Sequence, residues 1–387
     1  MKWVLYNKRL KQIGMAFRLL ILGSCAGNTP ESSVIREFTL SQDTVVIDTN
    51  GGIINLKFGL THPELSADGN YLYHYNYGEA RFDKVNLEKL ELEKTLQYEK
   101  EGPDGMGRNI GGYALTGTDQ MMVWSDQINA LFDQEGKKVR DLKLDKIVPE
   151  IESPETFPIR LMEHPGDSNR FYGLYGKWQD HQFFLIRFDL ESELYEKIPL
   201  PETMKLNDYR MEIEREGKPA GGFSPKPRAN AIQDNKIVIT NGAFNEAYVY
   251  DIQLDSLYLK TWESQLTPNQ NEYKLPKTVE LQQAEKHFMK FNESIFFLPP
   301  KWDPVSQRYI RLSFTTKFSE NMDEYGEAVE IGADVYLTVL DKELNMLGEQ
   351  YLDKYQKNPR QHFFTDNKIW LYENIADELG FVRITVD

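Results

Sequence analysis

The stretch LSADGNYLY, residues 65–73, places a tight turn between two strand-like runs. Asp68 and Gly69 supply the backbone conformations that such a turn needs. A second strand and turn follow at VNLE, residues 85–88, and apolar residues then alternate through Leu96. The unit therefore reads turn, strand, turn, strand, which predicts an antiparallel sheet with alternating burial.

The same unit recurs along the whole chain, six times in all. The copies begin near Asp68, Asp119, Asp167, Asp234, Asp303 and Asp366. Repeats of about 40–50 residues are typical of propeller blades, so the longer later copies require loop insertions. One insertion, residues 278–291, places Leu281, Ala284 and Phe288 on one helical face and predicts a helix.

These repeats predict an all-β fold, a six-bladed β-propeller, with seven blades as the alternative. Aromatic residues make up 12% of the chain, which suits pleated sheets that pack against one another. Two strand-like segments, residues 35–40 and 44–48, have no role in the first copy. We expect one of them to complete the last blade and to close the ring.

The formal net charge is −15, with 60 acidic and 45 basic residues. Binding to a phosphate backbone needs a basic footprint, so we expect no nucleic-acid partner. The chain has one cysteine, which excludes an internal disulfide and a CxxC metal site. The position of that cysteine is more informative than the count.

The amino terminus has the order of a signal peptide: basic residues, an apolar run over 13–22, and LGSC at 22–25. LGSC resembles the lipobox of bacterial lipoproteins, which implies cleavage before Cys25 and lipidation of that residue. Ala26, which is not aspartate, implies by the same resemblance the outer membrane, facing the periplasm. The apolar run is shorter than the ~20 residues that span a bilayer, so the lipid is the only expected membrane contact. Arg18 interrupts this run, and the alternative is an ordinary amino-terminal tail.

This pattern predicts three segments: a signal peptide at 1–24, a flexible tether at 25–33 and a single propeller domain at 34–387. The Asp-Gly turns followed by aromatic-rich strands resemble the TolB-like group of propellers. Together with the lipobox and EGPDGMG at 101–107, the chain is similar to an uncharacterised family of six-bladed propeller lipoproteins of Gram-negative bacteria. That resemblance implies a fold and a location in the cell envelope. It implies no activity.

Motifs of catalysis and cofactor binding do not appear in the sequence: there is no HExxH, P-loop, Gly-x-Ser-x-Gly or Rossmann glycine pattern. The six histidines lack metal-ligand spacing along the chain. We therefore assign no catalytic residue, and we expect no metal and no cofactor.

Arginines recur near the start of the first strand in several copies: Arg108, Arg160, Arg228 and Arg360. In a propeller the first strand of each blade lines the central channel, so these residues could form an anion-binding ring at one mouth. Their offsets from the following turn differ, and a shift of one residue moves a side chain to the other face. The alternative is that they form salt bridges between blades.

The sequence favours a non-catalytic binding or scaffold module in the cell envelope, expected to be a monomer. Its partner would be a small anionic ligand or an envelope protein segment that docks over the channel mouth. One alternative is a hydrolase or lyase acting on a saccharide or lactone, which requires converging carboxylates and a histidine. Another is an envelope protein-assembly factor, which an exposed apolar patch would favour.

Overall fold

The turn at residues 66–70 shows how these short strands are connected. Asp68 accepts hydrogen bonds from the Ser66 hydroxyl (2.5 Å) and the Asn70 amide (3.0 Å), and Gly69 has a φ of +73°. These hydrogen bonds lower the pKa of Asp68, and the bond from Ser66 has the largest effect. The Thr365 hydroxyl donates to the Gly69 carbonyl at 3.0 Å, so this turn also contacts the last sheet of the chain.

The computed structural model describes residues 38–60, 63–108, 110–117, 119–125, 128–151, 155–177, 181–303, 305–323 and 327–387. Their fold is all-β, as predicted. Three sheets follow one another along the first half of the chain, each with its strands in sequence order. They comprise β2 (Glu64–Leu65), β3 (Tyr71–Asn76), β4 (Arg81–Asn86) and β5 (Glu91–Gln97); β6 (Gly112–Leu115), β7 (Met121–Trp124), β8 (Asn129–Phe132) and β9 (Lys138–Asp141); and β10 (Thr156–His164), β11 (Asp167–Lys177), β12 (Phe183–Asp189) and β13 (Leu194–Pro199).

Two further sheets continue this order. In the second of them the first strand is broken into two short pieces, β21 and β22, which both pair with β23. The strands are β16 (Arg228–Ala229), β17 (Lys236–Thr240), β18 (Glu246–Asp251) and β19 (Ser256–Thr261); and β21 (Phe296–Phe297), β22 (Lys301–Asp303), β23 (Arg308–Met322), β24 (Ala328–Leu340) and β25 (Met346–Tyr351).

The last sheet combines both ends of the described chain. It contains β26 (His362–Thr365), β27 (Lys368–Ile375) and β28 (Glu378–Val386), and β1 (Leu40–Val46) pairs antiparallel with β28. The register runs from Leu40 opposite Val386 to Val46 opposite Gly380. The observed strand thus takes in the end of the first expected segment and most of the second.

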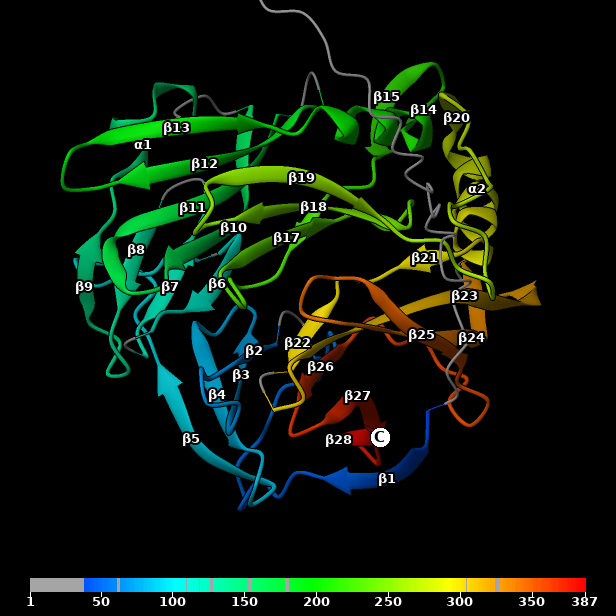
Figure 1. The fold of residues 1–387 in the computed structure, drawn as a ribbon, viewed down its shortest axis with the longest axis horizontal. Coiled ribbons are helices and arrows are strands. Elements are labelled where there is room, and N and C mark those ends of the chain that lie inside the picture. The colour runs from blue at the N-terminus through cyan, green and yellow to red at the C-terminus, as the bar shows by residue number, and fades with distance from the viewer. Residues whose placement is uncertain are drawn as a thin grey trace, which may run out of the picture. The chain divides into compact units, whose positions relative to one another are not determined.

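The sheets follow one another around a common centre, with β2, β6, β22 and β26 near it and β5, β9 and β13 at the periphery (Figure 1). Six apolar clusters of the described residues hold them together. Four clusters each join two consecutive sheets, and a fifth joins the first sheet to the last through residues such as Leu72 and Trp370. The sixth joins the last two sheets to residues outside them such as Met211 and Phe291. Burial of these faces is the main stabilising contribution of the fold.

Two insertions form an accessory unit beside the sheets. A three-stranded sheet contains β14 (Met211–Arg215), β15 (Lys218–Phe223) and β20 (Thr278–Glu280), and the helix α2 (Leu281–Glu293) follows β20. The expected helix over 278–291 therefore begins three residues later, because residues 278–280 pair with β14 instead. Ala284 and Phe291 are buried, whereas Leu281 at the helix start is exposed.

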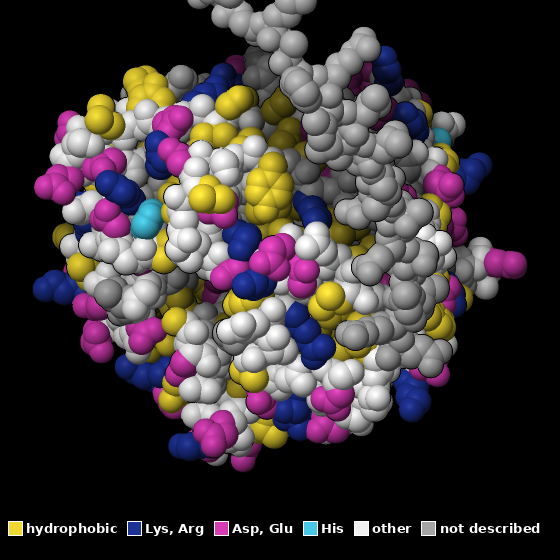
Figure 2. Space-filling view, in the orientation of Figure 1, with side chains coloured by type: hydrophobic (Ala, Val, Ile, Leu, Met, Phe, Trp, Pro, Cys, Tyr) yellow, Lys and Arg dark blue, Asp and Glu magenta, His cyan; other side chains and the backbone are white. Residues whose placement is uncertain are grey.

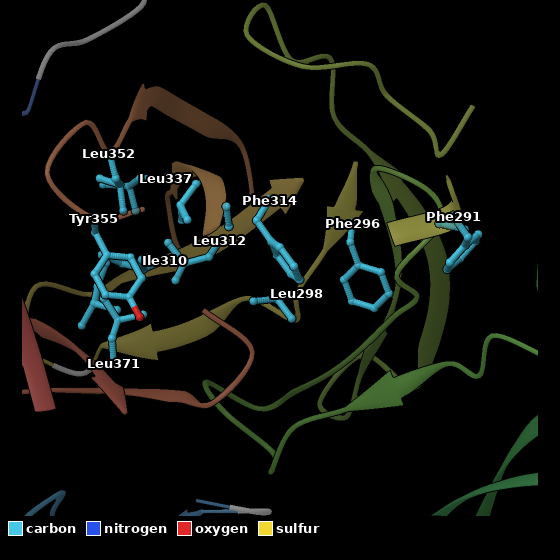
Figure 3. Close-up of a cluster of buried hydrophobic side chains, with 14 of the residues drawn as sticks. Phe291, Phe296, Leu298, Ile310, Leu312, Phe314, Leu337, Leu352, Tyr355 and Leu371 are labelled. Carbon is cyan, nitrogen blue, oxygen red and sulfur yellow. The ribbon is translucent and has the colours of Figure 1, made fainter. Parts of the chain in front are cut away.

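The apolar cluster under α2 continues from Phe291 through Phe296 and Phe314 to the strands of the last two sheets (Figure 3). The remaining helical elements are short. They are α1 (Leu144–Ile147) and two 3-10 helices, Pro149–Ile151 and Pro201–Tyr209. Within the described residues no helix combines the length and apolar character that a membrane span needs.

Close packing between strands makes one glycine a test of the fold. A Cβ atom on Gly173 would lie 2.3 Å from Tyr175 Cε2 and 3.1 Å from Leu161 Cδ2. We expect Gly173→Ala to lower the free energy of unfolding by about 1–3 kcal/mol, because the core must shift to admit the methyl group. Urea unfolding measures this change.

Gly117→Ala is the matched control, since the nearest atom to its added Cβ is Glu163 Oε2 at 3.9 Å. Its effect should stay within about 0.5 kcal/mol. Equal unfolding midpoints for the two variants would contradict the packing described for Gly173.

Candidate functional site: a central cavity

A cavity of about 1760 Å³ lies where the first strands of the sheets meet. Each of the six sheets of four or five strands contributes to its wall. The wall includes Glu64 from β2, Tyr113 from β6, Arg160 from β10, Arg228 from β16, Lys301 from β22 and His362 from β26. First strands are sheet edges here, so their side chains and free backbone edges line the cavity.

Arg160 is neutralised by a neighbour. Its guanidinium forms a two-pronged ion pair with Glu64, one contact of which is 3.0 Å long, and lies over the Trp124 ring at 5.8 Å. Burial opposes the charge of Arg160, but Glu64 outweighs it and the pKa of Arg160 is raised. This arginine therefore links β10 to β2, as the salt-bridge alternative proposed.

Arg228 has no such partner. Among the described residues, no side chain or carbonyl forms an ion pair or hydrogen bond with its guanidinium, which lies 5.8 Å from the centre of the Phe296 ring. The side chain is accessible to solvent from the cavity, yet the surrounding protein is close enough that burial lowers its pKa. Arg228 is therefore a cation in a cavity wall, and no neighbouring carboxylate neutralises its charge.

Arg360 lies near the same aromatic ring as Arg228. Its guanidinium donates to Asn292 Oδ1 at 2.7 Å and lies 5.0 Å from the centre of the Phe296 ring. Asn292 is held in place because its own amide donates to the Phe288 carbonyl at 2.9 Å, one turn earlier in α2. Burial first, and then the charge of Arg228, lowers the pKa of Arg360. Two like charges therefore share one aromatic ring.

Two wall residues were not anticipated from the sequence, Lys301 and His362. Lys301 Nζ donates to Asn230 Oδ1 at 2.9 Å, and burial lowers its pKa to about 8. His362 Nδ1 is 2.7 Å from the Pro359 carbonyl, so that nitrogen carries the hydrogen. Burial and the nearby Lys301 lower the pKa of His362 to about 3, and the ring is neutral at pH 7.

A sequence signal for Lys301 exists. Proline stands immediately before Arg228, Arg360 and Lys301, and two residues before Arg160. Proline lacks an N–H group and is tolerated on edge strands, so it is a natural mark of a strand that borders a cavity. The recurring unit is proline followed by a cation, and a search for arginine alone misses Lys301.

The prediction that Arg108 lies at the mouth of the central cavity is wrong. Its side chain is 77% exposed, pairs with Glu101, and does not line the cavity. It lies in the loop before β6, four residues ahead of the strand, and the wall position in that sheet is taken by Gly111 and Gly112. Gly107 rather than proline precedes it.

Several carboxylates of the cavity wall already have a cationic partner. Glu64 is held by Arg160, and the turn residues Asp234 and Asp366 pair with Lys236 and Lys368. The described residues contain no group of three or more histidine, cysteine, aspartate or glutamate side chains placed to hold a metal ion. On the face shown in Figure 2, Lys and Arg side chains are interspersed with Asp and Glu.

The two kinds of arginine differ in what their removal should do. We expect Arg160→Met to lower the free energy of unfolding by about 3 kcal/mol, because Glu64 is then left partly buried without its partner. Arg228→Met should change stability by less than about 0.5 kcal/mol or increase it, since no partner is lost and a like charge is removed. Chemical denaturation of both variants measures the contrast, and a large loss in Arg228→Met would contradict the unpaired state of Arg228.

Comparison with known proteins agrees with this fold. No curated protein sequence matches the chain. The structure of a DUF4221 family member from Bacteroides vulgatus is similar, with a TM-score of 0.64 at 13% identity, covering 92% of this chain and 99% of that one.

Weaker similarity links the chain to other proteins. These include the β-propeller domain of Myceliophteria thermophila Cps50 (Swd1), with a TM-score of 0.39, 9% identity, and 89% and 99% of the two chains covered. An oligogalacturonate lyase in complex with manganese has a TM-score of 0.36, 10% identity, and 90% and 91% coverage. The family model described as a domain of unknown function, DUF4221, matches residues 36–351, and the chain belongs to this family.

Proposed function

We propose that this chain is a six-bladed β-propeller that binds an anionic ligand in its central cavity and does not catalyse a reaction. The six sheets of four or five strands are its blades, and β1 completes the last of them and closes the ring. The observation that carries the proposal is the pair Arg228 and Arg360, which both lie near Phe296 in the cavity wall and have no carboxylate partner among the described residues.

The free-energy balance of these two arginines supports an anionic ligand. Both side chains remain accessible to solvent, yet the surrounding protein lowers the pKa of each, and the charge of Arg228 lowers that of Arg360 further. A carboxylate or phosphate between the two guanidinium groups would supply the missing counter-charge in the planar geometry that arginine favours.

The aromatic rings of the wall favour charge recognition over sugar stacking. Trp124 lies beneath Arg160, Trp370 lies beneath Arg383 at 4.9 Å, and Phe296 is contacted by both Arg228 and Arg360. A guanidinium thus occupies a face of each ring that a sugar would otherwise use. Glu64 is engaged by Arg160 and Asp43 by Arg383, so these two carboxylates already have a cationic partner.

We also propose that the chain is a lipoprotein of the outer membrane, anchored through Cys25 and facing the periplasm. Cys25, the signal peptide and the tether lie outside the described residues, and the support is the sequence LGSC at 22–25. The fold described for residues 38–387 would then be displayed on the anchor as a monomer.

A binding measurement tests the cavity. We expect citrate to bind the wild-type chain and to raise its melting temperature, because a ligand of the folded state stabilises it by mass action. The double variant Arg228→Met/Arg360→Met should weaken citrate binding at least about tenfold, since charge-assisted hydrogen bonds are lost. Isothermal titration calorimetry gives both affinities.

The double variant Arg108→Met/Arg170→Met is the control, because it removes the same charge from side chains that are 77% and 51% exposed. It should bind citrate as the wild type does. Equal losses in the two double variants would mean that citrate responds to net charge and not to this cavity.

A second measurement tests the anchor. Cys25→Ser should move the chain from the membrane fraction to the soluble fraction of the native envelope, because acyl chains on Cys25 are the only expected membrane contact. Unchanged fractionation of the variant would contradict the lipoprotein assignment.

A further inference from the structure

We propose that the ligand of the central cavity carries at least two separate anionic groups, one bound by Arg228 and Arg360 and the other by Lys301. This inference rests on the proposed function and names the class of ligand, a compound with two or more carboxylate or phosphate groups. It adds Lys301 to the binding site.

The three cations come from three consecutive sheets. Arg228 begins β16, Lys301 begins β22, and Arg360 lies two residues before β26. The charge of Arg228 lowers the pKa of both Arg360 and Lys301, so the three cations lie in one region of the wall. The cavity therefore presents several neighbouring positive charges that come from different sheets.

Lys301 lacks a carboxylate of its own. Glu64, the acid whose charge acts on Lys301, is held by Nη1 and Nη2 of Arg160. In the described part of the chain the ammonium group of Lys301 forms no ion pair, and its one hydrogen bond goes to the neutral Asn230 oxygen. An ammonium has three donors, so two remain for a ligand or for water.

The unpaired cations of the wall set the class of ligand. Arg160 is paired with Glu64 and Arg383 with Asp43, whereas Arg228, Arg360 and Lys301 form no ion pair with a described residue. A ligand with one negative charge would leave two of these cations uncompensated. The cavity volume of about 1760 Å³ also exceeds the ~300–1,000 Å³ of a typical small-molecule pocket, so an extended ligand has room.

The protonation of Lys301 gives the proposal a second observable. The charged and titratable groups that face it are Glu64, Arg160 and Arg228, with His362 neutral above pH 3. As the pH rises through about 8, the free protein loses the Lys301 charge. A bound anion favours the charged form, so binding at pH 8 should take up a proton, and affinity should fall as the pH rises from about 7 to 9.

Calorimetry with paired probes tests the proposal: acetate against citrate, and inorganic phosphate against pyrophosphate. Lys301→Met should weaken the binding of citrate and pyrophosphate at least about tenfold and change that of acetate and phosphate less than about twofold. Lys342→Met, whose side chain is 60% exposed, is the control and should change none of them. Titration at pH 8 in two buffers of different ionisation enthalpy measures the proton uptake.

Lys301→Arg separates charge from protonation. It should keep the affinity for citrate and abolish proton uptake at pH 8, because arginine does not titrate there. The proposal is overturned if Lys301→Met weakens acetate as much as citrate, or weakens neither. With either result, loss of citrate binding in Arg228→Met/Arg360→Met would still support the proposed function, an anion-binding cavity. Failure of the wild type to bind any of the four probes would contradict both proposals.

Discussion

Hydrogen bonding between β1 and β28 joins the two ends of the described chain, and the positions of the other sheets depend on it. The first sheet of the chain and the last are neighbours, in contact through Thr365 and Gly69 and through a shared apolar cluster. Each remaining sheet packs against the next through a cluster of its own. Displacement of one sheet would therefore expose apolar faces on both of its neighbours, which opposes local rearrangement.

This arrangement has a consequence for the electrostatics of the cavity. Sheets that converge on one centre bring their first strands together, so residues 70 or more positions apart in sequence share a small volume. Arg228 and Arg360 meet over Phe296, and Arg160 meets Glu64 across 96 positions of sequence. One arginine is compensated and two are not, although the same pattern of proline and cation introduces all three. The difference depends on whether a carboxylate happens to stand on the facing strand.

The accessory unit connects the outer part of the fold to the cavity. α2 is fixed by β20, which pairs with β14 from the other insertion, and by packing of Phe291 in the core. Through Asn292 the same helix holds the guanidinium of Arg360. A side chain of an insertion thus orients a residue of the cavity wall, which gives the long later repeats a structural role.

Local structure follows from the amino-acid sequence alone: the Asp-Gly turns, the alternating strands, the helical insertion and the recurrence of cations near the first strands. These features depend on residues close together in the chain, where propensity and periodicity act directly. The pairing partner of Arg160, the exposure of Arg108 and the place of Lys301 in the wall could not be predicted in this way. They depend on register and on which strands face one another, and a shift of one residue reverses the direction of a side chain. Only the tertiary structure decides which charges are brought together, because electrostatic compensation depends on distance in space and not on distance along the chain.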